Sequence, residues 1–374
     1  MKKLIVGLLG ISFCFVNAQE VSTIATIPNN YGDGMIVNIE GDILVSGGYD
    51  KSDIIKITPD GVVSTFIEGL PGPVGMGFDS LGNLYVANYS GNSISKITTE
   101  GIVSVFDSGL DGPAGLIVNN DEIFVTLYGS NFSGTGSTVL KYNLNGTSEV
   151  YAQNSGILDP IGITMDEENN IFVSNFIGGN VFQIDDNQEI ITFANVTGSS
   201  INQIVYSNNF IYVPSPNLRK IYRVDTSSGI VEHIAGNGGN SILDGDLLEA
   251  EFNRPNSCAI NLTGDILYIL EHNAGLIRAI DLSEILVVNE QEIEISDFLI
   301  TPNPSIDLVT LEFSSSENYS VRIFDVLGKE ILQLSGDSFQ EKITKTLDVS
   351  SWSKGTYFVE VRSGSYSETK KLIK

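Results

Sequence analysis

One pair of side chains capable of acid–base chemistry stands out in the 374-residue sequence: Glu271 is followed directly by His272 in the text LYILEHNAG. An imidazole beside a carboxylate can exchange protons near neutral pH, so the pair can serve as general acid and base. The chain has a second histidine, His233, in a predicted outer strand, where a surface or packing role is the more usual one. The sequence therefore offers Glu271 and His272 as catalytic candidates.

Oxygen-bearing side chains form a second candidate set, because they recur at matching places in repeated units of the chain. We predict that six of them face a common ligand-binding surface: Asp33, Asn88, Asn175, Asn202, Asn256 and Glu271. Carboxylate and amide oxygens are the ligands that Ca²⁺ prefers, and Mg²⁺ accepts them while keeping bound water. Within the set, a metal site for calcium or magnesium is predicted at Asp33, Asn88, Asn175 and Glu271. The alternative is structural, since Asn and Asp also end strands by capping backbone groups.

Aromatic side chains accompany these polar ones at inner or connecting positions of the repeats: Tyr31, Tyr49, Tyr89, Tyr128 and Phe176. Aromatic rings in such places can stack on a sugar or a peptide. They can equally fill space between neighbouring structural units, and the sequence leaves both interpretations open.

An internal repeat shows which elements must position these residues. The stretch PGPVGMGFDSLGNLYVANYSGNSISKI, from Pro71 to Ile97, has five counterparts, which begin near Tyr31, Asp111, Asp159, Ser200 and Arg254. Each unit of about 40 residues consists of short runs rich in β-branched residues, separated by Gly and Asn turns. Four-stranded units of this length are typical of a β-propeller. We therefore predict an all-β fold with a six-bladed β-propeller.

The first strand of the chain is predicted to close the ring. The text VSTIATI, from Val21, repeats the outer-strand text VSTFIEG, from Val63. An outer strand with no blade before it is expected to complete the last blade, whose third strand is predicted at Leu276 to Ile280. This arrangement leaves no open sheet edge. A competing fourth strand for that blade is Ile285 to Val288.

Aligning the units yields two rings of positions around the predicted channel. One ring lies at the end of each second strand: Gly47, Asn88, Leu127, Asn175, Ser215 and Glu271. The other lies at the start of each first strand: Asp33, Val74, Ala114, Ile161, Asn202 and Asn256. The alignment does not decide whether both rings face the same mouth of the channel.

The repeats resemble NHL repeats and the related gluconolactonase-like six-bladed superfamily. The similarity lies in the texts GNLYVAN and NNIFVSN and in the long segment Ile230 to Ile260, and it covers residues 19–284. The resemblance implies, for lactonases, a divalent ion held by Glu, Asn and Asp, but the first blade has Gly32-Asp33-Gly34 where their Glu-Gly-Pro would stand. A histidine-ligated lyase of this fold would need more than two histidines.

The C-terminal part has a different composition and no 40-residue rhythm. We expect a linker at residues 285–298 and a small immunoglobulin-like β-sandwich at 299–374. The texts PNPS, VRIFDVLGKEI and LDVSSWSKGTYFVEVRSG resemble the C-terminal sorting domain of the type IX secretion system of Bacteroidota. The positions that match its motifs are Pro302, Asn303, Pro304, Gly328, Lys329, Gly355 and Tyr357. The resemblance implies that the type IX translocon is a partner; an ordinary adhesive module is the alternative.

The N-terminus and the overall charge agree with export. Lys2 and Lys3, the apolar run Leu4 to Val16 and the small residue Ala18 predict a signal peptide at residues 1–18. The net charge of −26 disfavours nucleic acid as a partner, because phosphate binding needs a basic face. No later stretch reaches the length of a transmembrane helix. We expect a monomer, secreted or held at the outer-membrane surface of a Gram-negative bacterium.

Two functions fit these observations. The first is a binding or scaffold protein that recognises a glycan, a peptide or a protein at one face of the propeller. The second is a metal-dependent lactonase, another hydrolase or a lyase that uses channel carboxylates, Asn side chains and His272.

Overall fold

The computed structural model describes most of the chain: residues 19–153, 156–185, 187–283, 298–313, 319–326, 328–336, 342–363 and 366–374. The predicted signal peptide and most of the predicted linker lie outside these residues. The chain divides into two compact units, Met1–Glu284 and Ile285–Lys374. Both are built from β-strands, and each is described by itself.

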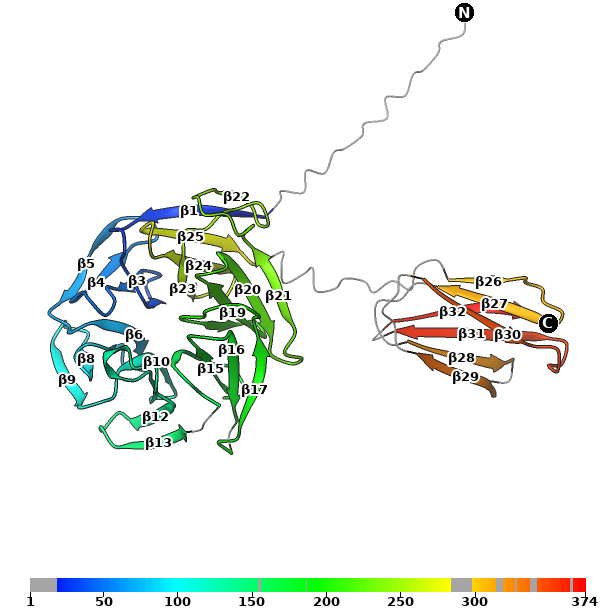
Figure 1. Ribbon diagram of the computed structural model, residues 1–374, viewed down its shortest axis with the longest axis horizontal. Coiled ribbons are helices and arrows are strands. Elements are labelled where there is room, and N and C mark those ends of the chain that lie inside the picture. The colour runs from blue at the N-terminus through cyan, green and yellow to red at the C-terminus, as the bar shows by residue number, and fades with distance from the viewer. Residues whose placement is uncertain are drawn as a thin grey trace, which may run out of the picture. The chain divides into compact units, whose positions relative to one another are not determined.

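The first unit is a β-propeller whose described residues form six antiparallel sheets (Figure 1). Five sheets follow chain order: β2 (Met35–Val37), β3 (Ile43–Ser46), β4 (Asp53–Ile57), β5 (Val63–Glu68); β6 (Pro73–Phe78), β7 (Leu84–Asn88), β8 (Ser93–Ile97), β9 (Val103–Ser108); β10 (Pro113–Asn119), β11 (Glu122–Leu127), β12 (Thr138–Asn143), β13 (Ser148–Gln153); β14 (Pro160–Met165), β15 (Ile171–Asn175), β16 (Asn180–Ile184), β17 (Ile190–Asn195); and β18 (Val205–Ser207), β19 (Phe210–Ser215), β20 (Lys220–Asp225), β21 (Val231–Ala235). In each sheet the last strand lies at the rim of the ring.

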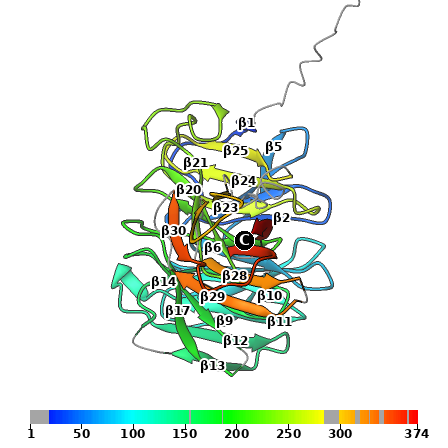
Figure 2. The same ribbon diagram turned by 90° about the vertical axis from the view of Figure 1, so that its right-hand side faces the viewer.

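The sixth sheet joins the two ends of the propeller. It contains, in spatial order, β22 (Gly245–Asp246), β1 (Glu20–Thr26), β25 (Leu276–Asp281), β24 (Ile266–Glu271) and β23 (Pro255–Ile260). β1 pairs antiparallel with β25, with Val21 opposite Ile280 and Thr26 opposite Leu276, and the two strands lie together in both views (Figures 1 and 2). Counted outward from β23, β1 is the fourth strand of this sheet. This is the position that its similarity to the outer-strand text VSTFIEG predicted. The competing segment Ile285 to Val288 lies outside the described residues.

The innermost strands approach one another more closely than side chains would allow. A Cβ atom on Gly115 would lie 2.1 Å from the carbonyl oxygen of Ile161 in the next sheet, and one on Gly162 would lie 2.4 Å from that of Asn202. Gly34 and Gly75 lie equally close to the next inner strand. The Pro-x-Gly text of the repeat is therefore explained by backbone contact between neighbouring blades.

Hydroxyl groups from the second strands tie these contacts together. Thr126 Oγ1 accepts a hydrogen bond from Gly115 N at 2.8 Å and donates one to Ile161 O at 3.0 Å. Ser174 does the same between Gly162 N and Asn202 O, at 3.0 and 2.8 Å. Each hydroxyl satisfies backbone groups that the bulged register of the first two strands leaves unpaired.

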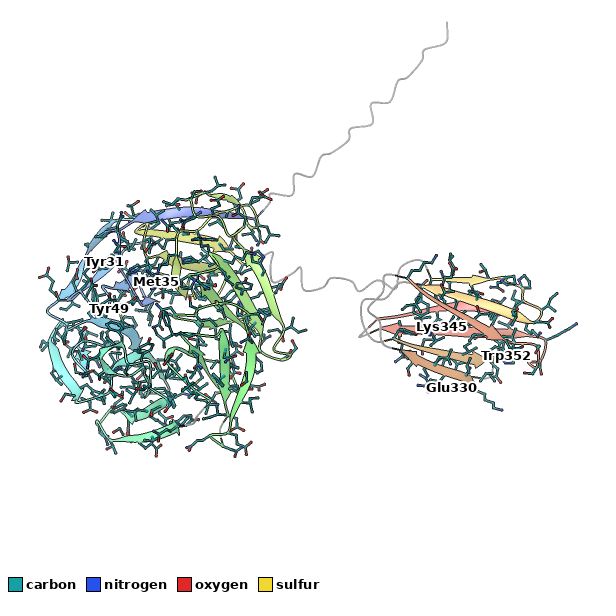
Figure 3. The ribbon with its side chains drawn as sticks, viewed as in Figure 1. Tyr31, Met35, Tyr49, Glu330, Lys345 and Trp352 are labelled. Carbon is teal, nitrogen blue, oxygen red and sulfur yellow. The ribbon has the colours of Figure 1, made fainter. Side chains whose placement is uncertain are left out.

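The second unit is a β-sandwich. One sheet has the order β26 (Leu299–Thr301), β27 (Leu308–Phe313), β30 (Ile343–Asp348), and the other has the order β29 (Glu330–Gly336), β28 (Tyr319–Asp325), β31 (Thr356–Ser363), β32 (Tyr366–Ile373). Buried side chains from both sheets, such as Phe313, Val321 and Val359, form one core. Trp352 packs beside this core, with its ring 4.9 Å from that of Tyr357 (Figure 3).

Residues at the positions that resemble the sorting-domain motifs hold the ends of this sandwich together. Asn303 accepts a hydrogen bond from Ile373 N at 2.9 Å and donates one to Lys371 O. Gly355 exchanges two backbone hydrogen bonds with Lys374. Gly328 adopts φ +80° in the turn before Lys329, and the Tyr357 hydroxyl donates to Ser353 O. These contacts give the motif a structural role within the module.

Because the inner strands lie so close together, adding one methyl group at an inner glycine should strongly lower the stability of the propeller. Replacing Gly115 with Ala should destabilise the propeller by about 2–3 kcal/mol, because the new Cβ overlaps a backbone atom that cannot rotate away. Gly156→Ala is the control, since its Cβ would contact only Phe182 at 3.4 Å. Thermal unfolding of the two variants checks the prediction; equal melting temperatures would contradict it.

Candidate ligand-binding pocket

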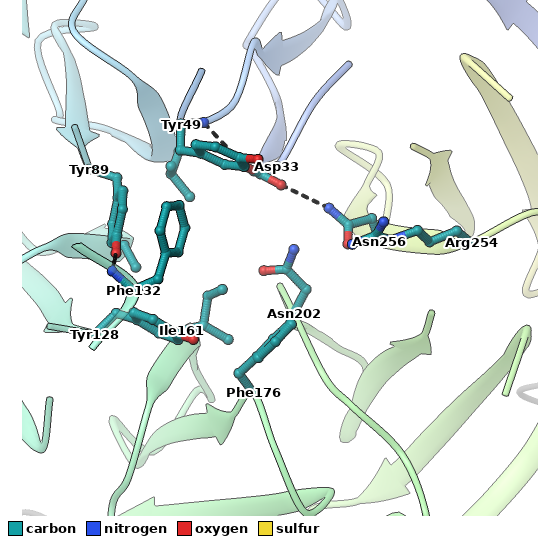
Figure 4. Close-up of a pocket in the computed structure, with 12 residues that line it drawn as sticks. Asp33, Tyr49, Tyr89, Tyr128, Phe132, Ile161, Phe176, Asn202, Arg254 and Asn256 are labelled. Carbon is teal, nitrogen blue, oxygen red and sulfur yellow. Dashed lines mark hydrogen bonds between the residues drawn. The ribbon is translucent and has the colours of Figure 1, made fainter. Parts of the chain in front are cut away.

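The inner ends of the first strands surround a pocket of about 180 Å³ (Figure 4). All six positions of the first-strand ring line it: Asp33, Val74, Ala114, Ile161, Asn202 and Asn256. Three of these positions are apolar and neighbour one another in the chain order of the blades, and three are polar. These six residues alone therefore give the pocket an apolar side and a polar side.

Aromatic rings from connecting loops extend the apolar side. They are Tyr49, Tyr89, Tyr128, Phe132 and Phe176. The rings contact one another edge to face or tilted, with centroids 4.9 Å apart for Tyr49 and Phe132 and for Tyr89 and Phe132. The Tyr89 hydroxyl accepts a hydrogen bond from Phe132 N at 2.7 Å and donates one to Gly129 O at 3.0 Å, which fixes the Phe132 loop against the pocket.

Four of the five aromatic residues identified in the sequence thus lie in one pocket. Tyr31, the fifth, is buried in the core between sheets instead (Figure 3). Sequence reasoning missed Phe132, which lies in the short 3₁₀ turn η1 (Ser130–Phe132) within a longer loop. The loop between β11 and β12 is longer than the corresponding loop between β7 and β8. This extra length was the sequence signal that could have identified Phe132.

The polar side of the pocket is built around Asp33, Asn202 and Asn256. Asn256 Nδ2 donates to Asp33 Oδ1 at 3.0 Å, and Asp33 Oδ2 accepts a bond from Tyr49 N at 3.3 Å. Asn202 is only 4% exposed, and its Oδ1 atom has no hydrogen-bond partner among the described residues. A buried acceptor without a partner is costly, and such atoms mark places where a ligand or water completes the bonding.

The residues of the second-strand ring lie behind the first-strand residues that line the pocket. Asn88 and Asn175 are 0% and 3% exposed and do not line the pocket. Asn88 Nδ2 donates to Ser95 Oγ at 2.8 Å, and Asn175 Oδ1 accepts from Leu158 N at 3.2 Å. The physical reason is the position of the strands, because each second strand is covered on its channel side by the first strand of the same sheet.

Glu271 likewise faces the protein interior. Its carboxylate forms an ion pair with Arg278, both side chains being 0% exposed, and accepts a hydrogen bond from Asn253 N at 2.5 Å. Arg278 also pairs with Asp244 at 2.5 Å and donates to backbone carbonyls of the long segment before β23. Burial raises the pKa of Glu271, against the opposing effect of the Asn253 amide and the Arg278 guanidinium.

The two histidines are also engaged in backbone contacts. His272 Nδ1 lies 3.0 Å from Gly32 O, and His272 does not line the pocket. His233 Nε2 lies 2.7 Å from Gly236 O, in the outer strand β21. The proximity of Glu271 and His272 in the sequence therefore does not place the two side chains together at the pocket.

The four residues predicted to hold a metal ion do not fit a common site, because only Asp33 lines the pocket while Asn88, Asn175 and Glu271 have separate buried partners. Over the described part of the chain, no cluster of three or more His, Cys, Asp or Glu side chains could hold a metal ion. We derive no chemical step through calcium or magnesium.

Comparison with known proteins identifies the C-terminal module. Residues 299–374 match the family model described as a secretion system C-terminal sorting domain. The module is a sorting domain. The protein is therefore exported by type IX secretion to the outside or the surface of the cell. Among the described residues, we find no helical segment with the length and hydrophobicity that a membrane span requires.

Solved structures share the propeller fold. An auxiliary nutrient binding protein from Bacteroides thetaiotaomicron matches with a TM-score of 0.59 and 14% identity, over 70% of this chain and 76% of that one. A gluconolactonase from Xanthomonas campestris matches with a TM-score of 0.56 and 14% identity, over 70% and 89%. Virginiamycin B lyase from Staphylococcus aureus matches at 0.52 and 17%, over 79% and 95%. No curated protein matches the sequence. Such low identities establish the fold alone.

The buried ion pair predicts a loss of stability without a change at the pocket. Glu271→Gln should lower the free energy of unfolding by about 3 kcal/mol, because it leaves the buried Arg278 without its buried counter-charge. The control is Glu122→Gln, which removes a surface pair with Lys141 and should cost less than about 1 kcal/mol. Chemical denaturation measures both values, and a Glu271→Gln variant as stable as the control would contradict the assignment.

Proposed function

We propose that the exported propeller is a binding protein that holds a saccharide in the pocket formed by its first strands. The observation that carries the proposal is that five aromatic rings and the polar residues Asp33, Asn202 and Asn256 line one cavity. Ligand sites commonly combine an apolar lining with a few convergent polar groups in this way.

A sugar matches this division better than the other ligand classes that the sequence allows. A pyranose ring has a face of C–H groups, which stack on the negative face of an aromatic ring, and an edge of hydroxyl groups. Each hydroxyl donates and accepts, and the polar side supplies a carboxylate acceptor together with amides that do both. The unpartnered Asn202 Oδ1 would receive a sugar hydroxyl.

The geometry offers less to the enzymatic alternative, a metal-dependent lactonase, hydrolase or lyase. That function would rest on Glu271 and His272, whose side chains are held by Arg278 and by Gly32 O away from the pocket.

Binding to a saccharide array, followed by calorimetry with the retained sugar, tests the proposal. Tyr49→Ala and Asn202→Ala should each weaken binding about tenfold, because one removes a stacking surface and the other a buried hydrogen-bond partner. Phe66→Ala is the matched control, since Phe66 is an exposed aromatic residue on β5, the outer strand of the sheet beside Tyr49. The proposal fails if no saccharide is retained, or if all three variants bind equally.

Export through the C-terminal module has its own test. A chain that ends after Glu290 lacks residues 299–374 and should accumulate in the periplasm of a host with type IX secretion. The full-length chain in the same host should reach the medium or the cell surface. Fractionation and immunoblotting measure the distribution, and normal secretion of the shortened chain would contradict the assignment.

A further inference from the structure

We propose that Arg219 and Arg254 form an anion-binding subsite beside the saccharide pocket, so that the preferred ligand is an acidic sugar carrying a carboxylate or sulfate group. This inference rests on the proposed saccharide-binding function and specifies its substrate class. It concerns a second cavity, of about 340 Å³, that shares Phe176, Arg254 and Asn256 with the first. The first cavity alone, at about 180 Å³, is below the size typical of ligand pockets, about 300–1,000 Å³.

The distribution of charge makes this cavity unusual in the molecule. Residues 19–284 contain 32 acidic and nine basic side chains. Six of the nine form ion pairs with carboxylates: Lys51, Lys56, Lys96, Lys141, Arg223 and Arg278. The other three, Arg219, Lys220 and Arg254, have no ion pair among the described residues, and two of them line this one cavity. Its lining contains no carboxylate.

Two unpaired guanidinium groups on one cavity repel each other, and an oxyanion placed between them would relieve that repulsion. A guanidinium presents a planar fork of N–H donors that matches a carboxylate or sulfate group. Arg254 is exposed, and Arg219 is half-buried with one weak contact, 3.5 Å from Nη1 to Gly238 O. Both therefore keep donors for a ligand.

The backbone holds both arginines at strand entrances in an uncommon conformation. Arg219 has φ 56° directly before β20, and Arg254 has φ 64° directly before β23. Left-handed backbone is uncommon for a long side chain, and such positions persist where the surrounding structure requires them. Here the entrance of each strand directs an arginine to the same cavity.

Three carboxylates that hydrogen-bond to residues lining these cavities or that belong to the segment before β23 have other partners. Asp33, in the adjoining pocket, binds Asn256 Nδ2 at 3.0 Å. Glu251 accepts bonds from Ser241 N at 2.9 Å and from Asn237 Nδ2 at 3.3 Å, and Glu271 pairs with Arg278. An acidic sugar could thus stack on Phe176, which both cavities share, while its charged group meets the arginines and its hydroxyls meet Asp33 and the Asn side chains.

The test is calorimetry on the exported protein with two matched pairs of probes. One pair is an oligogalacturonate and its methyl ester, and the other is a sulfated galactan oligomer and its desulfated form. We expect the acidic member of at least one pair to bind more tightly than its neutral partner. The pair that responds distinguishes a carboxylate from a sulfate as the source of the charge.

Arg254→Gln and Arg219→Gln should each weaken binding of the acidic probe about 10- to 100-fold, because each removes a charge-assisted hydrogen bond. Affinity for the neutral partner should change less than about twofold. Lys220→Gln is the control, because this unpaired cation does not line the cavity. Unchanged melting temperatures show that the variants fold, and raising the salt concentration should weaken only the acidic probes.

The possible failures are distinguishable. Equal binding of acidic and neutral probes, or an acidic preference unaffected by either arginine substitution, overturns the anion subsite and leaves the saccharide pocket standing. Failure of all four probes together with an empty saccharide array contradicts both proposals. Arginine-dependent binding of peptides with a free terminal carboxylate, with no saccharide bound, also contradicts both.

Discussion

The contact between neighbouring inner strands is the constraint on which the rest of the propeller depends. Gly115 and Gly162 lie with their α-carbons against carbonyl groups of the next sheet, where no Cβ would fit. Hydroxyls of Thr126 and Ser174 bridge the same contacts. Four of the six first-strand positions that line the pocket directly precede one of these closely packed glycines: Asp33, Val74, Ala114 and Ile161. The other two, Asn202 and Asn256, precede Gln203 and Ser257.

Closure of the ring is supported by a different interaction, the buried pair of Glu271 and Arg278. Arg278 reaches from β25 to the carboxylate at the end of β24 and to Asp244 in the long segment that also supplies β22. The same sheet holds the N-terminal strand. The pair therefore lies where strands from both ends of the propeller meet, and a buried charge there needs its partner. This structural use of Glu271 separates it from the pocket.

Residues from several blades and loops line the pocket. The aromatic residues come from connections after β3, β7, β11 and β15, and the polar ones from the entrances of β2, β18 and β23. The aromatic and polar residues thus line one pocket although they come from different connections around the ring. The two arginines without ion pairs line a cavity that shares Asn256 with the pocket, in a propeller where six of the other seven basic residues are paired.

Much of the fold was predictable from the sequence, because repeated strands and Gly–Asn turns are local signals. The unit from Pro71 to Ile97 has the predicted strands, and the motifs of the C-terminal module were sufficient to identify it. The candidate site was only partly predictable. Asp33, Asn202 and Asn256 meet in the pocket together with four of the aromatic residues, whereas Asn88, Asn175 and Glu271 lie behind the first strands.

The sequence by itself determined the strands, the number of repeats and the sorting module, since these follow from patterns within about 40 residues. The tertiary structure alone decided which polar residues face the ligand, because that depends on which strand is innermost. It also decided that Glu271 is bound by Arg278, and that Arg219 and Arg254, 35 positions apart, share a cavity. Such pairings depend on which separate loops meet around the ring. A local sequence pattern does not encode which distant residues become neighbours.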